Sequence, residues 1–314
     1  MLRVVDPLTL MGKEISTNSG KAPIQIIGGN IKDNFEYVMP IASAQVKSSL
    51  MLASLSSGKS IKITEPKITR DHTEKMIEYL GGSIEVSESS EGKTIFLKNS
   101  KLSKISTYEV VGDFSSAAFI IVAALISRNS EVLIKNVGLN KTRSGLLEVL
   151  LQMNANIEII NKTKTCNEDC ADIIVKSSNL EGINVPNSII PNIIDEIPIL
   201  SVAASFAEGQ TIIKNASELK VKESDRLHAT SMGLKTMNVK HDLLDDGLII
   251  NGTQDDVEIH EVIESFGDHR IAMSFLIAGL RSKNGVKVRD CSNIETSFPN
   301  FSKTMNNLGM NINE

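Results

Sequence analysis

The residues of this 314-residue chain that could do chemistry recur at two kinds of place. One is the start of an apolar, helix-like stretch, where unpaired N–H groups and the helix dipole favour anions. The other is the polar loop after a short β-branched run, where Arg or Lys can grip a phosphate or carboxylate. The residues at these places are Ser43, Ala44, Gln45, Arg70, Arg143, Asp195, Lys222, Glu223, Arg226, Asp268, His269 and Arg270. The sequence therefore predicts a site for a small polyanion.

The densest group of these residues is the segment VKESDR, residues 221–226. Lys222 and Arg226 are four residues apart, so they share one face if a helix has already begun there. With Arg70 and Arg270, Arg226 makes three guanidinium groups that could each hold an oxyanion in a planar two-point grip. We expect these cations to converge although they lie far apart in the sequence.

Two carboxylates, Asp195 and Glu223, are the candidates for acid and base work. Nearby cations keep a carboxylate ionised, whereas burial raises its pKa, so two such groups can take opposite roles. Simpler interpretations exist for each feature. An Asp or Ser at a helix start, such as Asp195, Asp268 or Ser43, is often only a cap, and Lys-Glu-x-x-Arg is also typical of a solvated helix face.

An internal repeat organises the elements that must position these side chains. Four β-branched runs, SIKITE, EVLIKN, TIIKN and VKVRD, end at Glu65, Asn136, Asn215 and Asp290, which are separated by 71, 79 and 75 residues. A helix-like stretch rich in Ala and Ser precedes each run, and a polar loop with a second helix follows it. Two further strand-like segments close three of the four units.

Each unit thus reads helix, strand, helix, strand, strand, with one more strand leading into the next copy. This order predicts an α/β protein built by repetition. We place a domain boundary near Val110, because residues 99–107 form the most polar and least periodic early connection. The predicted domains are residues 1–109, with one unit and part of another, and 110–314, with three units.

Composition limits the class of protein. There are 33 Lys and Arg against 38 Asp and Glu, a net charge of −5, which argues against a general nucleic-acid or anionic-membrane binder. No apolar run approaches the roughly 20 residues of a membrane span, and residues 1–19 lack a signal-peptide core. The three cysteines suit neither a disulfide framework nor a zinc site. We expect a cytoplasmic protein without a metal.

Six motifs give the chain a family resemblance. They are ASAQVKS (42–48), TRDHTE (69–74), DEIP (195–198), LKVKESDRL (219–227), GDHRIAM (267–273) and TSFP (296–299). In this order and at these spacings they resemble the enolpyruvylshikimate-phosphate synthases, over almost the whole chain. Ser43 followed by Ala44, and Thr296 before Phe-Pro, resemble the second class of that family.

The resemblance implies two similar domains of βαβαββ units, an inside-out α/β barrel with the active site between the domains. It implies transfer of the enolpyruvyl group of phosphoenolpyruvate to the 5-hydroxyl of shikimate 3-phosphate, releasing phosphate without a cofactor. Asp195 and Glu223 would be catalytic. Shikimate 3-phosphate would contact Ser43, Ala44, Gln45, Arg70, Asp195 and Lys222; phosphoenolpyruvate would contact Gln45, Arg226 and Arg270.

One departure from the family pattern concerns the start of the chain. PLTLMGKEI, residues 7–15, resembles a stretch that lies well inside the family pattern, so the family's opening segment is absent from this sequence. We therefore expect an N-terminally short, monomeric member. The alternatives are a non-catalytic remnant that only binds shikimate 3-phosphate, and a UDP-N-acetylglucosamine 1-carboxyvinyltransferase, which shares the fold and the donor.

Overall fold

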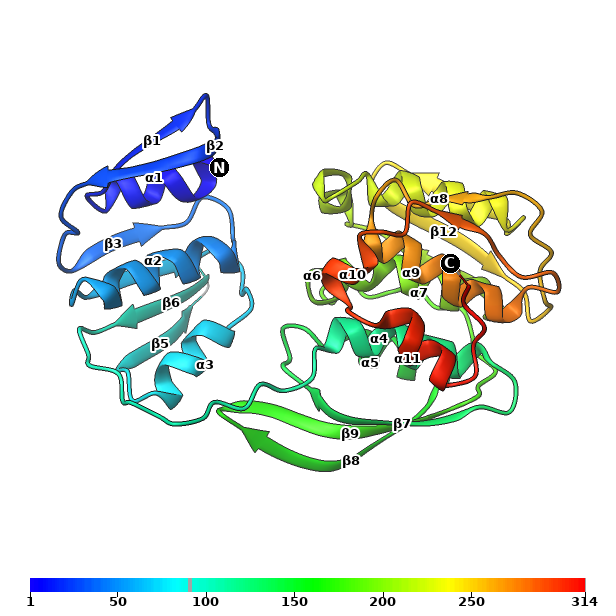
Figure 1. The fold of residues 1–314 in the computed structure, drawn as a ribbon. Coiled ribbons are helices and arrows are strands. Elements are labelled where there is room, and N and C mark those ends of the chain that lie inside the picture. Colours follow the sequence, from blue (N-terminus) through cyan, green and yellow to red (C-terminus); the bar gives the residue numbers. More distant parts are fainter. Residues whose placement is uncertain (90–91, 314) are drawn as a thin grey trace. The chain divides into compact units, whose positions relative to one another are not determined.

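The computed structural model describes residues 1–89 and 92–313, which form two compact units (Figure 1). Unit 1 comprises residues 1–110 with 164–168, and unit 2 comprises 111–163 with 169–314. Each unit has its own apolar core. None of the described helices combines the length and apolarity needed to cross a membrane.

Unit 1 is built around a four-stranded sheet of order β3-β4-β6-β5, in which β3 is parallel to β4 and the other neighbours are antiparallel. A separate β1–β2 hairpin precedes it. Its elements are α1 (Leu2–Leu10), β1 (Glu14–Asn18), β2 (Lys21–Gly28), β3 (Phe35–Val38), α2 (Ala44–Ser56), β4 (Ile61–Glu65), α3 (His72–Tyr79), β5 (Ile84–Ser89) and β6 (Gly92–Leu97).

Unit 2 contains two three-stranded sheets, β7-β9-β8 and β10-β12-β11, and a parallel pair, β13–β14. Its helices are α4 (Phe114–Ile126), α5 (Gly145–Gln152), α6 (Ile190–Ile193), η1 (Ile194–Glu196), α7 (Ile197–Ser205), η2 (Ser217–Val221), α8 (Arg226–Thr236), α9 (His269–Ala278), η3 (Gly279–Arg281), α10 (Ile294–Ser297) and α11 (Phe301–Asn307). Its strands are β7 (Glu131–Gly138), β8 (Asn156–Thr165), β9 (Glu168–Lys176), β10 (Gly209–Ile213), β11 (His241–Leu244), β12 (Gly247–Gly252), β13 (Ile263–Glu264) and β14 (Val288–Arg289). The turn between β8 and β9 is grouped with unit 1.

The predicted repeat is confirmed element by element. The four β-branched runs are β4, β7, β10 and β14, each preceded by a helix (α2, α4, α7, α9) and followed by another (α3, α5, α8, α11). The predicted leading strand is present in the first and fourth copies, as β3 beside β4 and β13 beside β14, both parallel. In the second and third copies it is reduced to the isolated parallel bridges Gly112–Val137 and Asn184–Ile212. An antiparallel hairpin then closes the first three units.

The first helices of the repeats in unit 2 are buried on several sides. Eleven of the 13 residues of α4 and all nine of α7 are buried. Small Ala and Ser side chains let such helices approach closely, and α7 packs against both α4 and α9. Figure 1 shows these helices between the sheets of unit 2, so their first turns are held by the core.

Two local expectations are corrected. Asp195 does not cap a helix: it lies within the 3₁₀-helix η1, and Glu196 is the residue before α7. Lys222 and Arg226 do not share a helix face, because α8 begins only at Arg226. Ser43 and Asp268, in contrast, do cap α2 and α9 through their side chains.

Candidate active site

Asp195 is the centre of a charged cluster in unit 2. Its Oδ1 lies 3.2 Å from Arg226 Nη1 and 3.7 Å from Lys222 Nζ. Its Oδ2 lies 3.3 Å from Arg143 Nη1. Elements distant in the sequence supply these cations: Arg143 precedes α5, Lys222 follows η2, and Arg226 opens α8. Both oxygens of one carboxylate are thus paired with positive groups.

Arg226 is surrounded by carboxylates and is only 1% exposed. Its Nε donates to Asp268 Oδ2 at 2.8 Å and its Nη1 donates to Asp195 Oδ1. Its Nη2 donates to Glu223 Oε2 at 2.5 Å. The side chain of Glu223 is 56% exposed, whereas that of Asp268 is fully buried. Glu223 is therefore the partner that an incoming anion could most easily replace.

Arg270 joins the cluster from the first turn of α9. Its Nη1 donates to the backbone oxygen of Asp195 at 3.1 Å and lies 3.4 Å from Glu196 Oε1. Its backbone N–H donates to Asp268 Oδ1 at 2.9 Å. Glu196 also accepts a hydrogen bond from Ser115, the second residue of α4. Three helix starts in unit 2, those of α4, α7 and α9, therefore meet at this cluster.

The cluster shifts the pKa values of three of its groups. Burial raises the pKa of Glu196, although Arg270 and Arg143 oppose the shift. Burial alone would raise the pKa of Asp268, but the hydrogen bond and charge of Arg226 outweigh it and the net pKa is lowered. The pKa of His269 is lowered by burial and by the charge of Arg270, so its imidazole is neutral at pH 7. The region thus keeps Asp268 charged and His269 uncharged.

In unit 1 the candidate residues lie at the start of two neighbouring helices. Residues 43–45 form the cap and the first two residues of α2, and Arg70 lies in the loop between β4 and α3. Ser48 of α2 and Thr73 of α3 are joined by a hydrogen bond between their hydroxyl groups, 2.6 Å apart. The structure therefore brings the segment 43–45 and the loop of Arg70 to the same end of the sheet.

Sequence reasoning missed the roles of Glu196 and Ser115. Glu196 carries no separate signal because it adjoins Asp195, and Ser115 carries none because a Ser near a helix start is so common. The signal was present in the repeat: DFSS and DEIP occupy equivalent helix starts, so polar residues in both had reason to meet. The repeat places Arg143 in the series of loop cations, but it does not predict the contact of Arg143 with Asp195.

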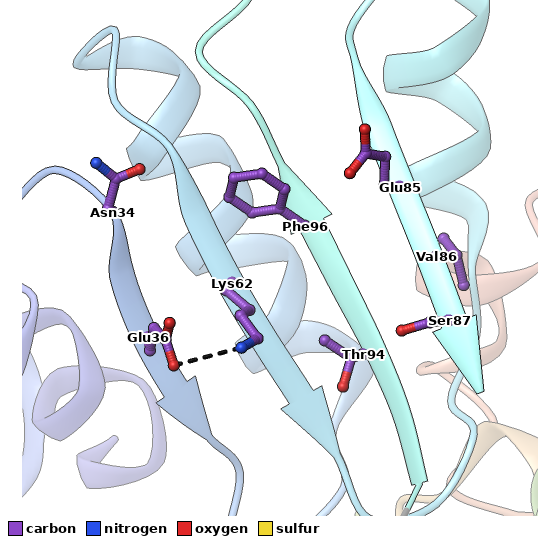
Figure 2. Close-up of a pocket in the computed structure, with 8 residues that line it drawn as sticks. All are labelled: Asn34, Glu36, Lys62, Glu85, Val86, Ser87, Thr94 and Phe96. Carbon is purple, nitrogen blue, oxygen red and sulfur yellow. Dashed lines mark ion pairs between the residues drawn. The ribbon is translucent and has the colours of Figure 1, made fainter. Parts of the chain in front are cut away.

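A hollow lies elsewhere, on the open face of the unit 1 sheet. Figure 2 shows it, with side chains from four strands around a cavity of about 460 Å³. It is lined by Asn34, Glu36, Lys62, Glu85, Val86, Ser87, Thr94 and Phe96. Its one drawn ion pair joins Lys62 and Glu36 at 3.5 Å. None of the residues predicted for substrate binding lines this hollow.

Comparison with known proteins decides the family. The model of the EPSP synthase (3-phosphoshikimate 1-carboxyvinyltransferase) family matches residues 1–305. The chain belongs to the EPSP synthase family. A 3-phosphoshikimate 1-carboxyvinyltransferase of Magnetococcus marinus is 42% identical over 100% of this chain and 70% of the relative. One from a Thermoanaerobacter species is 45% identical over 98% of this chain and 71% of the relative.

A solved structure of EPSP synthase from Acinetobacter baumannii matches with a TM-score of 0.90 and 39% identity, covering 100% of this chain and 71% of that one. The predicted α/β fold and the predicted family are confirmed. EPSP synthases transfer the enolpyruvyl group of phosphoenolpyruvate to shikimate 3-phosphate in the shikimate pathway of aromatic amino acid biosynthesis. The chain is accordingly an enzyme of the transferase class.

Proposed function

We propose that Asp195 and Glu223 carry the proton transfers of this reaction. Asp195 accepts the proton from the 5-hydroxyl of shikimate 3-phosphate as that oxygen attacks carbon 2 of phosphoenolpyruvate. Glu223 delivers a proton to the methylene carbon, which becomes a methyl group in a tetrahedral ketal. Loss of a methyl proton and expulsion of phosphate then restore the double bond in the product. The exposure of Glu223 and the burial of its neighbours support this division.

We propose that Arg226 and Arg270 bind the carboxylate of phosphoenolpyruvate. The observation that carries the proposal is the pairing of Arg226: each of its three guanidinium nitrogens donates to a carboxylate, and of these three carboxylates only that of Glu223 is exposed. A substrate carboxylate that replaces Glu223 on Nη2 frees Glu223 from Arg226, so that Glu223 can take up a proton from water and deliver it to the methylene carbon. Binding and protonation are then linked by one exchange of partners.

Shikimate 3-phosphate contacts Ser43, Ala44, Gln45, Arg70, Asp195 and Lys222 in this proposal, with Arg70 on its phosphate and Gln45 touching both substrates. The helix start at residues 43–45 supports an anion there, because the first N–H groups of α2 have no partner within the helix. Family resemblance supplies the residue-by-residue roles. The positive groups stabilise charge on the departing phosphate.

Phosphate release with both substrates, together with calorimetric titration of shikimate 3-phosphate, tests the proposal. We expect Asp195→Asn and Glu223→Gln each to lower kcat by roughly 10²-fold or more. Binding of shikimate 3-phosphate should persist in Glu223→Gln. Asp242→Asn, at an exposed position of unit 2, is the control and should keep wild-type turnover.

Two results would contradict these roles. Turnover by Asp195→Asn within a few-fold of wild type would exclude Asp195 as the base. Tight binding of shikimate 3-phosphate by the wild-type chain without any phosphate release would instead favour a protein that only holds the acceptor.

We further propose that residues 1–109 are the later part of the first enolpyruvyl transferase domain and that 110–314 are the second domain. The repeat supports this, since three of its four copies fall after Val110. We also propose a monomer located in the cytoplasm, where both phosphorylated substrates are available. Light scattering after size-exclusion chromatography tests the monomer, and a mass near 68 kDa, twice the 34.2 kDa of the chain, would overturn it.

A further inference from the structure

Four charged side chains lie inside the core of unit 1, and none of them is assigned a role above. Lys47 and Glu65 are fully buried, and Glu74 and Lys93 are each 6% exposed. Lys47 Nζ lies 2.6 Å from Glu74 Oε1 and 3.2 Å from Glu65 Oε2. Lys93 Nζ lies 3.8 Å from Glu74 Oε1. We call Lys47, Glu65, Glu74 and Lys93 the buried tetrad.

The two strand residues of the tetrad, Glu65 and Lys93, occupy positions where the burial pattern of the strands favours apolar side chains. In β4, Ile61 and Ile63 face the core and Glu65 continues the same face. In β6, the core-facing residues Ile95 and Leu97 are in line with Lys93, which is the register partner of Glu65. At this end of the sheet, the buried faces of β4 and β6 therefore carry the opposite charges of Glu65 and Lys93.

Burial of two ion pairs is weak evidence for a role in stability. Removing charges from water costs several kcal/mol per ion, and well-packed apolar residues often replace such pairs without loss of stability. The charges contribute to the geometry of unit 1, because each hydrogen bond and ion pair restricts the position of the group that it holds. The question is therefore which segments the tetrad fixes.

The tetrad holds both shikimate 3-phosphate segments of unit 1. Glu65 accepts hydrogen bonds from the backbone N–H of Thr69 at 3.2 Å and from its hydroxyl at 2.6 Å, and Thr69 directly precedes Arg70. Lys47 lies one turn after the cap of α2, and its backbone N–H donates to the Ser43 oxygen at 3.0 Å. One carboxylate, Glu65, thus connects the Arg70 loop to α2 through Lys47.

We propose that Lys47 and Glu65 are positioning residues for shikimate 3-phosphate, which set the Arg70 loop against the first turn of α2. This rests on the proposed roles of residues 43–45 and Arg70. Glu65 holds the loop through Thr69, and Lys47 holds Glu65 and Glu74 at a fixed distance from the helix. The tetrad itself touches no substrate.

Two variants test this role. Glu65→Gln removes the charge that binds Lys47, and Thr69→Val removes only the hydroxyl that donates to Glu65. We expect each to raise the Kd of shikimate 3-phosphate, measured by calorimetry, by about tenfold, which is ~1.4 kcal/mol. The KM for phosphoenolpyruvate at saturating shikimate 3-phosphate should stay within twofold of wild type, a split that general destabilisation would not produce.

Lys93→Met is the matched control. It also removes a buried charge from the tetrad, but Lys93 has no described contact with the Arg70 loop or with α2. We expect it to lower Tm without changing the Kd of shikimate 3-phosphate. Equal weakening by Lys93→Met and Glu65→Gln, or an unchanged Kd in both Glu65→Gln and Thr69→Val, would overturn the positioning role.

Amide hydrogen exchange separates this inference from the proposed function. If the wild-type chain did not bind shikimate 3-phosphate, the roles of residues 43–45 and Arg70 would fail. The positioning of the loop would still be visible in faster exchange at Thr69 and Arg70 in Glu65→Gln than in Lys93→Met. Identical exchange in the two variants would refute the tie between Glu65 and the loop, whatever the substrate result.

Discussion

Arg226 is a buried cation whose charge is balanced by neighbouring carboxylates. Asp268 is fully buried and Asp195 nearly so, and both remain beside Arg226. Breaking a buried ion pair typically costs 3–5 kcal/mol because the remaining charge is unpaired. The arrangement therefore leaves Glu223 as the one partner whose departure carries little cost, since it can return to water.

Glu196 should make the stability of the chain depend on pH. Its pKa is raised above the ordinary 4.5, so the folded state favours the protonated form. That contribution is fully present below pH 4.5 and is lost as pH rises through the folded pKa. Glu196→Gln removes the titration, so its unfolding free energy should improve relative to wild type as pH rises, by at most ~1.4 kcal/mol per pH unit.

Urea unfolding of wild type and Glu196→Gln at several pH values between 4 and 8 measures this difference. A stability gap that is constant with pH, or that moves in favour of the wild type as pH rises, would show that the pairing with Arg270 and Arg143 outweighs burial. Glu148 lies in the first turn of α5 and is not part of the Asp195 cluster. Glu148→Gln therefore serves as the control, and its stability relative to wild type should not change comparably with pH.

At the residue scale, the sequence predicted the types of the site residues better than their contacts. Lys222, Arg226 and Arg270 converge around Asp195 in unit 2, as their recurrence in equivalent places suggested. The bond that each cation makes depends on tertiary packing of α8, α9 and η1. Local periodicity carries no information on such contacts, so the arginine pairing of Asp268 could not be foreseen.

Among the elements, the residues that end three of the four β-branched runs share a backbone conformation. Asn136, Asn215 and Asp290 have φ values of 53°, 58° and 60°, in the left-handed region. Asn and Asp adopt this conformation more readily than other residues with a Cβ. In these three copies the repeat therefore includes the backbone conformation as well as the pattern of side chains.

Substitution at Asn136 tests this conformation. We expect Asn136→Ala to lower the unfolding free energy by about 1 kcal/mol, because Ala disfavours positive φ. Asn136→Gly should cost less, since Gly adopts that region freely. Chemical denaturation of both variants measures the difference in unfolding free energy. An Ala variant as stable as the Gly variant would mean that the left-handed conformation at residue 136 imposes no strain.

Helix α8 packs so closely on α9 that its Gly233 has no room for a side chain. A Cβ at Gly233 would overlap the ring of Phe275, which is fully buried. We expect Gly233→Ala to destabilise the chain by about 1–3 kcal/mol through overpacking. Thermal unfolding of Gly233→Ala and of Gly233→Ala/Phe275→Leu checks the cause, because the smaller Leu should recover part of the loss. A double variant no more stable than the single one would mean that overlap with Phe275 is not the cause of the destabilisation.

The elements themselves were largely predictable. β-branched runs, Ala-rich helices and polar loops are local signals, and all four copies appear where the repeat placed them. The start of α7 was not predictable in the same way. Pro198 at its second position suits a first helical turn, but the 3₁₀ segment before it reflects the packing of Asp195 and Glu196 rather than a local signal.

In the whole molecule, two separate apolar cores predict two unfolding transitions. Leu50 lies in the core of unit 1 and Leu200 in that of unit 2, and both are fully buried. We expect Leu50→Ala and Leu200→Ala each to cost about 2–5 kcal/mol in one unit. Calorimetry should show each substitution shifting a different transition; a single transition lowered equally by both would mean that the units unfold together.

The left-handed residues at the ends of three β-branched runs also mark these copies in a way that residue identity does not. At Asn136, Asn215 and Asp290 the permitted replacements are dictated by backbone angle, so Gly is accepted and Val or Ile is refused at all three. If the stability of every single substitution along the chain were measured, β-branched side chains would be poorly tolerated at each of these three positions. Their spacing would follow the period of the repeat without any reference to sequence likeness between the copies.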